Sequence, residues 1–141
     1  MISRASFQVL QPMEVRWGDM DAFGHLNNAK YFTYCESARI RYFQEIGLGQ
    51  LTKTPKVAPV VVAASCNFRR QVRFPADLEV GVRASRLGTS SSDLEYGIFR
   101  AGTDELAADG TSVVVWVDYR LEKAAPLPDD VRARIRELDG I

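Results

Sequence analysis

The first hydrophobic pattern of the chain is that of a β-strand. Phe7, Val9, Val15 and Trp17 occupy odd positions, although the alternation between them is imperfect. Alternation of this kind places every second side chain on one face of an extended strand. Because Pro12 lacks the amide hydrogen that a ladder of hydrogen bonds needs, we expect the strand from Phe7 to Trp17 to be interrupted there.

The hydrophobic period becomes helical from Asn28 to Ile46. Asn27 or Asn28 is expected to cap this helix, because an asparagine side chain accepts a hydrogen bond from a free amide of the first turn. Gly47 and Gly49 predict its end. A helix of about 19 residues would be about 28 Å long. The apolar side chains that recur at spacings of three or four form one wide face, and they are Tyr31, Tyr34, Cys35, Ala38, Tyr42 and Ile46.

The remaining patterns predict four strands and a short terminal helix. The run Val113–Val117 is typical of a central strand that is buried on both faces. Asp129 follows Pro128 and is expected to cap a helix that ends at Leu138. Turn residues between the strands predict three hairpins, so we expect a meander. The expected strands span residues 57–72, 78–87, 93–100 and 106–121, with hairpins at 74–77, 88–91 and 101–104.

This order of elements predicts an α+β fold in a single domain over residues 1–141. One long helix is best buried when an antiparallel sheet wraps around it. The edges of such a sheet stay open, and pairing with a second copy of the chain would cover one of them. A length of 141 residues suits one domain, and no repeat, low-complexity tract or linker divides the sequence.

Composition narrows the classes of partner. Eighteen Lys and Arg residues balance eighteen Asp and Glu residues, so the net charge favours neither nucleic acid nor an anionic membrane. The longest apolar stretch, residues 57–65, is too short for membrane insertion. Two isolated cysteines suit a reducing compartment, and no apolar run near the N-terminus predicts a signal peptide. We therefore expect a cytoplasmic protein.

Several kinds of chemistry lack the residues they need. One histidine and no CxxC pair leave too few ligands for a zinc site, so no metal is expected. The sequence contains no glycine pattern typical of nucleotide or dinucleotide binding and no GxSxG elbow. Phosphoryl transfer, hydride transfer and serine-based hydrolysis therefore have no support in the sequence.

Polar groups with catalytic potential are concentrated in the loop before the long helix. The segment Trp17–Tyr31 contains two aspartates, the histidine and two asparagines. The first amides of a helix have no internal partners and the helix dipole adds positive potential, so they can polarise a carbonyl oxygen. A carboxylate facing the same carbonyl would complete the requirements of acyl transfer. The same residue types also bond to the backbone in ordinary loops, so their crowding alone leaves a structural role open.

The loop and the first helical turns together form a recognisable motif. Its residues are Asp19, Asp21, Gly24, His25, Asn27, Asn28, Tyr31 and the run Glu36–Arg39. The motif resembles that of the hot-dog thioesterases of the 4-hydroxybenzoyl-CoA thioesterase type, which include the acyl-CoA thioesterases associated with the Tol-Pal system. The resemblance is close from Val15 to about Phe43 and looser over residues 6–122. It implies a hot-dog fold, in which a five-stranded antiparallel sheet wraps around the long helix, and it implies no cofactor.

The resemblance also implies an assembly and a set of roles. Subunits would pair into homodimers or dimers of dimers, with active sites at the interface. Asp21 would attack the thioester carbon as nucleophile or activate a water as general base. The backbone amide of Asn28 would polarise the thioester carbonyl. His25 would orient the substrate or a water molecule, or it would brace the loop. The residues expected beside the substrate are Asn27, Tyr31 and Glu36. Asn27 could instead brace the loop, and Glu36 could instead form an ion pair with Arg39 or Arg41 on the helix.

One departure from the family concerns the acyl carrier. In the 4-hydroxybenzoyl-CoA enzyme, a basic cluster in the hairpin before the fourth strand grips the coenzyme phosphates. Here that hairpin is Gly88–Ser92, and Arg86 is the nearest cation. Arg69–Arg70 and Arg132–Arg136 are either phosphate contacts or solvated charges, and we favour solvated charges.

Three functions are compatible with these observations. The first hypothesis is hydrolysis of a short-to-medium or aromatic acyl-CoA. The alternatives are hydrolysis of acyl-ACP and a non-catalytic module that binds acyl thioesters.

Overall fold

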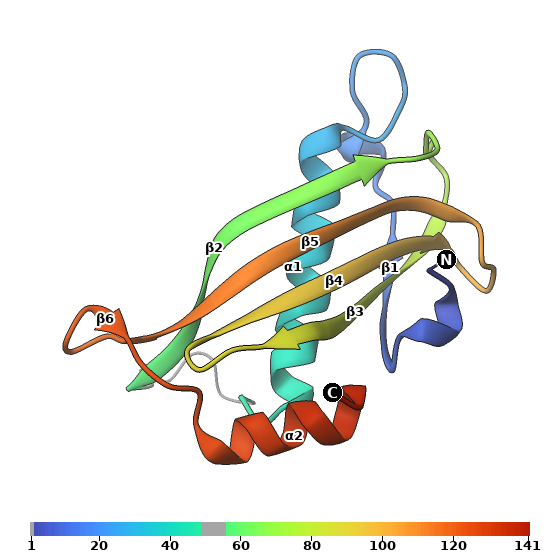
Figure 1. Cartoon of the computed structure of the whole chain (residues 1–141). Helices are drawn as coiled ribbons and strands as arrows, with labels where there is room; N and C mark the ends of the chain where they lie inside the picture. Colours follow the sequence, from blue (N-terminus) through green and yellow to red (C-terminus); the bar gives the residue numbers. More distant parts are fainter. Residues whose placement is uncertain (1, 49–55) are drawn as a thin grey trace.

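A long helix crossed by a curved antiparallel sheet makes up the body of the protein (Figure 1). The computed structural model describes residues 2–48 and 56–141. Helix α1 spans Asn28–Glu45, and helix α2 spans Asp129–Asp139. This is the predicted hot-dog architecture, with a short sixth strand added. The strands are β1 (Val9–Glu14), β2 (Val57–Phe68), β3 (Asp77–Leu87), β4 (Ser91–Arg100), β5 (Leu106–Asp118) and β6 (Lys123–Ala124).

The sheet order departs from the predicted meander. The strands run β1-β3-β4-β5-β2, with β6 beside β5, and every pair is antiparallel. The hairpins predicted at 88–91 and 101–104 are confirmed, but the one predicted at 74–77 is wrong. Strand β2 pairs with β5 at one edge of the sheet, so residues 69–76 cross to β3 near the other edge. Hydrophobic alternation identifies a strand without specifying its neighbour, which explains the error.

The first strand is continuous through its proline. Pro12 lies opposite Glu79 in the register of β1 with β3, and no break separates Val9 from Glu14. The expected interruption is therefore wrong. Strand β1 is an edge strand with a neighbour on one side only. A proline is tolerated there because an edge strand has no second strand to which its amide hydrogens must be donated.

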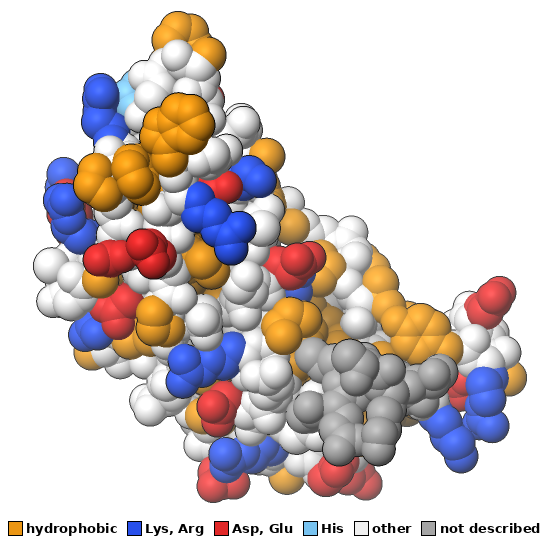
Figure 2. Space-filling model, turned by 180° about the vertical axis from the view of Figure 1, so that it is seen from behind, with side chains coloured by type: hydrophobic (Ala, Val, Ile, Leu, Met, Phe, Trp, Pro, Cys, Tyr) orange, Lys and Arg blue, Asp and Glu red, His pale blue; other side chains and the backbone are white. Residues whose placement is uncertain are grey.

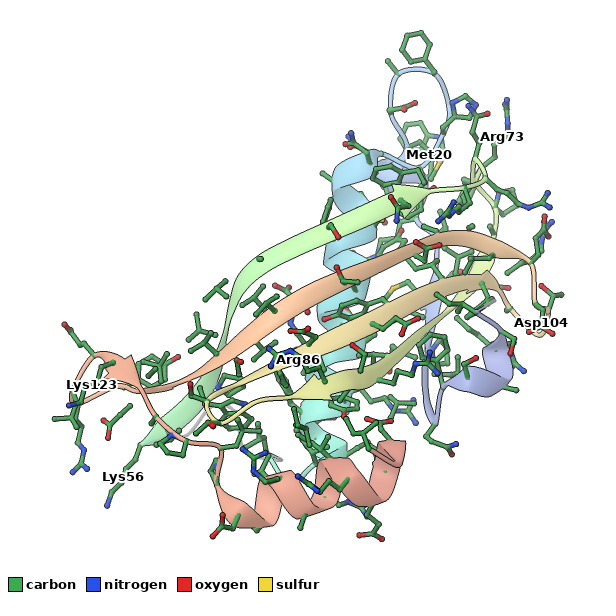
Figure 3. All side chains as sticks on the ribbon, in the orientation of Figure 1. Met20, Lys56, Arg73, Arg86, Asp104 and Lys123 are labelled. Atoms are coloured by element: carbon green, nitrogen blue, oxygen red, sulfur yellow. The ribbon has the colours of Figure 1, made fainter. Side chains whose placement is uncertain are left out.

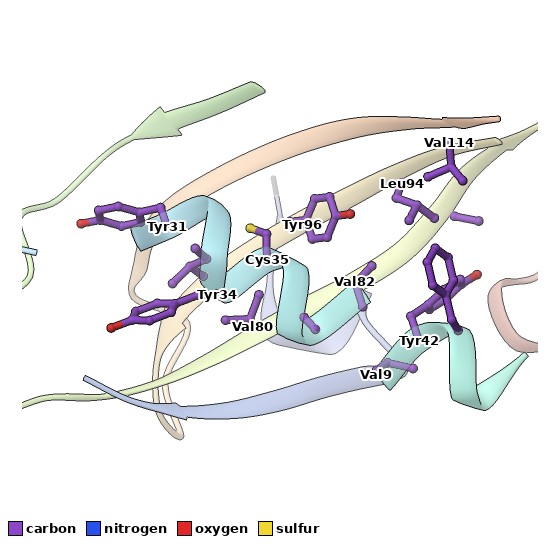
Figure 4. Close-up of a cluster of buried hydrophobic side chains, with 14 of the residues drawn as sticks. Val9, Tyr31, Tyr34, Cys35, Tyr42, Val80, Val82, Leu94, Tyr96 and Val114 are labelled. Atoms are coloured by element: carbon purple, nitrogen blue, oxygen red, sulfur yellow. The ribbon is translucent and has the colours of Figure 1, made fainter. Parts of the chain in front are cut away.

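The core forms between α1 and one face of the sheet (Figure 4). All six apolar residues that were assigned to the inner face of the helix are buried, so this prediction is confirmed. Tyr42 and Ala38 pack toward Val80, Val82 and Leu94 of the sheet, all of them nearly inaccessible to solvent. Burial of apolar area at roughly 25 cal/mol per Å² makes this interface the main source of stability.

The face of the sheet away from α1 is less covered. In β5, Val114 and Trp116 are buried against the core, whereas Val113, Val115 and Val117 are only half-buried. The expectation of burial on both faces is therefore wrong. The reason is that the one long helix covers a single face.

Hydrogen bonds fix both helices to the sheet. Asn27 is the N-cap of α1, and its Oδ1 accepts from the Ala29 amide at 3.0 Å. Gly47 follows the helix with φ +100°, as a stop residue should, while Gly49 lies outside the described residues. The Asp139 carboxylate of α2 accepts from the Tyr42 hydroxyl and from the Ala84 amide. Residue 139 thus joins α2 to α1 and to β3.

The start of α2 differs from the prediction. Pro128 occupies the N-cap position and Asp129 is the first helical residue, so the predicted Asp129 cap is wrong. Asp129 and Asp130 still lie in the first turn, where negative charge interacts favourably with the helix dipole. Within residues 2–48 and 56–141, no helix combines the length and the apolarity needed to cross a membrane.

The docking of α2 depends on Ile135, which is 1% exposed. We expect Ile135→Ala to lower the free energy of unfolding by about 2–5 kcal/mol, because the cavity would not be refilled. Glu137→Ala on the same helix, whose side chain is 73% exposed, should change it by less than about 1 kcal/mol. Urea unfolding followed by circular dichroism measures both. Equal effects of the two substitutions would show that α2 does not pack as described.

Candidate active site

The loop from Trp17 to Asn27 is closed by backbone hydrogen bonds. The Asp21 amide donates to the His25 carbonyl at 2.7 Å, and the Asn27 amide donates to the Asp19 carbonyl at 2.9 Å. Gly24 has φ +82°, a conformation that glycine adopts without strain. The Leu26 amide donates to the carbonyl of Val72 at 2.7 Å, which fixes the loop to the segment after β2. The loop is therefore held at the head of α1 (Figure 3).

The Asp21 carboxylate has a bonded oxygen and an available one. Its Oδ1 accepts from the Phe23 amide at 2.8 Å and from the His25 amide at 3.1 Å. In the described part of the chain, no hydrogen bond occupies Oδ2. The His25 amide, followed by the Phe23 amide, lowers the pKa of Asp21 below its ordinary value of 3.8. The carboxylate is therefore ionised at neutral pH.

Donors at the head of α1 lie in the same cleft as this carboxylate. Asp21, His25, Asn27, Asn28 and Tyr31 line a cleft of about 550 Å³. The Asn27 side chain is committed to its cap, whereas no hydrogen bond among the described residues uses the Asn28 amide. The structure thus brings together five of the six residues that the sequence nominated.

His25 braces the loop through its backbone. Its amide donates to the Asp21 carboxylate and its carbonyl accepts from the Asp21 amide. Its side-chain Nε2 is buried and has no hydrogen-bond partner among the described residues. A buried nitrogen without a partner costs about 1–3 kcal/mol, and His25 is among the residues that line the cleft.

Glu36 is the nominated residue that lies elsewhere. It is exposed on α1 and lines a separate hollow of about 220 Å³, together with Arg39 and residues of β2, β4 and β5. Among the described residues it forms no ion pair with Arg39 or Arg41. In this chain Glu36 therefore does not reach the Asp21 cleft.

The other aspartate of the motif supports the structure. The Asp19 carboxylate accepts from the Tyr34 hydroxyl at 2.6 Å and lies 3.7 Å from the Lys30 amine. Burial first, and then the bond to Asp19, raises the pKa of Tyr34 well above its ordinary value. Asp19 thus supports the structure, through its carboxylate toward Tyr34 and Lys30 and through its carbonyl toward the Asn27 amide.

The two thiols lack the properties of nucleophiles. Burial raises the pKa of Cys35 to about 12 and that of Cys66 to about 11, so both stay protonated at neutral pH. Cys35 lies on the buried face of α1, as the sequence predicted. In the described ranges, no three His, Cys, Asp or Glu side chains are grouped to hold a metal ion.

The end of β2 and the two arginines that follow it complete the cleft, and none of them was among the nominated site residues. Phe68 packs edge-on against Tyr31 with ring centroids 5.0 Å apart. Arg69 and Arg70 also line the cleft, although solvated charge was the favoured interpretation. Figure 2 shows the single histidine beside basic and hydrophobic side chains at this end of the molecule. In the sequence, only the pair of positive charges at Arg69–Arg70 hinted at a role in binding. The contact between this segment and the loop joins residues that are distant in sequence, so the sequence pattern could not predict it.

Comparisons with known proteins agree with this geometry. The family model of the thioesterase-like superfamily matches residues 15–135. The uncharacterized protein YsmA of Bacillus subtilis is 33% identical over 127 residues, covering 90% of this chain and 84% of YsmA. The long-chain acyl-CoA thioesterase FadM of Escherichia coli is 25% identical over 126 residues, covering 89% and 96%.

A solved structure extends the likeness to three dimensions. A Thermus thermophilus thioesterase, complexed with coenzyme A and Zn, has a TM-score of 0.85 and 38% sequence identity. The match covers 96% of this chain and 97% of that one. The chain therefore belongs to the thioesterase-like superfamily and is a hot-dog thioester hydrolase.

Proposed function

We propose that the chain hydrolyses acyl-CoA thioesters in the cleft at the head of α1, with Asp21 as the reacting carboxylate. The observation that carries this proposal is that an ionised carboxylate and an unbonded helix amide, that of Asn28, line one cleft. Acyl transfer needs this combination, because negative charge develops on the carbonyl oxygen while its carbon is attacked. The short-to-medium or aromatic acyl group expected from the sequence remains part of the proposal.

Two routes use the same geometry. As nucleophile, Oδ2 of Asp21 attacks the thioester carbon, the thiolate of the carrier leaves, and water then hydrolyses the mixed anhydride. As general base, the carboxylate takes a proton from the water that attacks the carbon directly. In both routes the Asn28 amide donates to the carbonyl oxygen, and the positive end of the α1 dipole stabilises its charge.

Other residues of the cleft would position the substrate. The unpaired Nε2 of His25 would bond to the thioester or to the attacking water. Tyr31 would contact the acyl group, since it lines the cleft and packs on Phe68. Asn27 acts through its cap, which fixes the direction of the free amide. Glu36 remains a candidate contact only for a group that extends along α1 into the second hollow.

The choice of carrier separates the first hypothesis from its alternative. The likeness to FadM and to a thioesterase complexed with coenzyme A supports acyl-CoA. A relative from Arabidopsis thaliana, ATL3, is an acyl-acyl carrier protein thioesterase, so kinetics with both carriers are the test that separates the two hypotheses. A non-catalytic binding module would not need an ionised carboxylate in the cleft, so the state of Asp21 counts against that alternative.

We also propose that the chain forms a homo-oligomer through β2. This strand pairs only with β5 among the described residues, and its side chains include exposed Val61, Val62 and Phe68. An exposed apolar edge strand invites pairing with another strand, and a second copy supplies the complementary edge. Because Phe68 lines the cleft, such pairing would bring a partner subunit close to the active site.

Replacement of Asp21 tests the chemistry. We expect Asp21→Asn to lower kcat/KM for acyl-CoA by about a hundredfold or more, while its amide oxygen still accepts the Phe23 and His25 amides. Asp118→Asn is the matched control, because Asp118 likewise accepts two backbone amides, those of Arg120 and Leu121, outside the cleft. Thiol release from a panel of acyl-CoAs measures both. Full activity of the Asp21 variant would remove Asp21 from the mechanism.

The lowered pKa of Asp21 predicts the pH dependence. Because the folded-state value lies below 3.8, the carboxylate should stay ionised and kcat/KM should not fall between about pH 7 and about pH 5. The stabilisation that this carboxylate gives the fold is present above its unfolded-state pKa and disappears as the pH falls through the lowered one. A carbon-detected NMR titration of Asp21 gives the value directly. A measured pKa above 3.8 would contradict the described loop.

The oligomer has its own test. Val62→Lys places a charge on the exposed part of β2, where the side chain is 60% exposed in the single chain. We expect wild type to elute as a dimer or tetramer and the variant to shift toward monomer, because burying an unpaired lysine is unfavourable. Multi-angle light scattering after size exclusion gives the masses. A monomeric wild type would refute pairing through β2.

A further inference from the structure

A third space, distinct from the hollow that Glu36 lines, adjoins the cleft of Asp21 on the side of the crossing segment, residues 69–76. It has a volume of about 280 Å³ and shares Arg70 and Gln71 with the cleft. Its apolar lining includes Val72, Leu78 and Ala107, all of which are buried. Because the two spaces have lining residues in common, the hollow and the cleft are neighbours on the surface.

The charged groups of the hollow are mainly basic. Arg70, Arg73 and Arg100 line it, and Glu105 is the only acidic residue among its described lining. Glu105 lies 3.5 Å from Arg70 and 3.7 Å from Arg100, so one carboxylate serves two guanidinium groups. Arg73 has no ion pair within the described residues. The hollow therefore has surplus positive charge, which favours an anionic ligand.

The shape of that ligand is indicated by an aromatic ring. Phe74 lines the hollow and is 46% exposed, so part of its ring remains accessible. Aromatic rings stack on nucleobases, while arginine forks match the geometry of phosphate oxygens. Glu14 and Asp77 line a neighbouring hollow, which shares Phe74 and Arg100 with this one. Arginines beside an aromatic ring and an apolar floor suit a phosphorylated nucleotide.

In this chain, the basic side chains near the hairpin Gly88–Ser92 form hydrogen bonds and ion pairs within the protein. Arg86 forms a two-pronged pair with Asp93, at 2.9 and 3.0 Å. Arg132 of α2 donates to the Gly88 and Thr89 carbonyls, at 2.7 and 3.1 Å. Figure 3 places Arg86 on the sheet well away from Arg73, which lies at the end that holds Met20 and the loop. The basic groups of this hairpin are thus committed to the fold.

We propose that the hollow of Arg70, Arg73, Phe74 and Arg100 binds the phosphorylated adenosine of coenzyme A. This inference rests on the proposed function, because the thioester end of the same molecule lies in the Asp21 cleft. The arginines contact the phosphates and Phe74 stacks on the adenine. The chain would then bind the phosphates with the crossing segment instead of the hairpin, and it would prefer acyl-CoA to a carrier without adenosine.

The test compares one acyl group on two thiols. Arg73→Gln should raise KM for the acyl-CoA by about tenfold with kcat unchanged, because a lost phosphate contact removes ground-state and transition-state binding equally. The same acyl group on N-acetylcysteamine, which lacks the nucleotide, should show no change in KM. Arg86→Gln is the control in the hairpin and should leave both substrates unchanged.

Binding of the nucleotide alone separates this inference from the proposed function. Calorimetry with adenosine 3′,5′-bisphosphate should show binding to wild type and about tenfold weaker binding to Arg73→Gln. The inference is overturned if Arg73→Gln binds the nucleotide like wild type, or if Arg86→Gln alone weakens binding. If wild type binds the nucleotide and hydrolyses neither thioester, the proposed reaction fails while the nucleotide site stands.

Discussion

Burial of one face of α1 against one face of the sheet is the constraint on which the other features depend. The helix has a single wide apolar face, and the sheet offers a complementary surface rich in valine and leucine. Once that face is buried, the direction of the helix is set, and so is the place where its unbonded first amides emerge. The loop before the helix must therefore close at this point, and it does so with its own backbone and with the Val72 carbonyl.

Asp21 has a structural role through one carboxylate oxygen, and the proposed chemistry would use the other oxygen. Bonds from the Phe23 and His25 amides to Oδ1 hold the loop and keep the group ionised. Among the described residues no hydrogen bond occupies the other oxygen, and Asp21 and Asn28 line the same cleft. Because the loop that positions the carboxylate is itself held by that carboxylate, an alanine here would disturb geometry and charge together, whereas an asparagine isolates the charge.

The segment between β2 and β3 connects the cleft with its surroundings. It crosses from one edge of the sheet toward the other, and on its way it passes the motif loop. The end of β2 and this path place Phe68 and Arg70 in the candidate cleft and Arg73 in the adjoining hollow. It also leaves β2 as an exposed edge, so catalysis, carrier binding and assembly would all involve one continuous stretch of chain.

The sequence by itself determined the elements and the motif. Helical spacing from Asn28 to Ile46, alternation in the strands and capping chemistry at Asn27 are local properties, so the helix and the five main strands were predictable. The five cleft residues were nominated by the resemblance of their motif to that of a known family. The neighbour of β2, the continuity of β1 and the position of Glu36 were decided only by the tertiary structure. So were the cleft contacts of Phe68, Arg69 and Arg70. These features depend on segments that are distant in sequence and meet after folding, and periodicity within a segment carries no information about its partner.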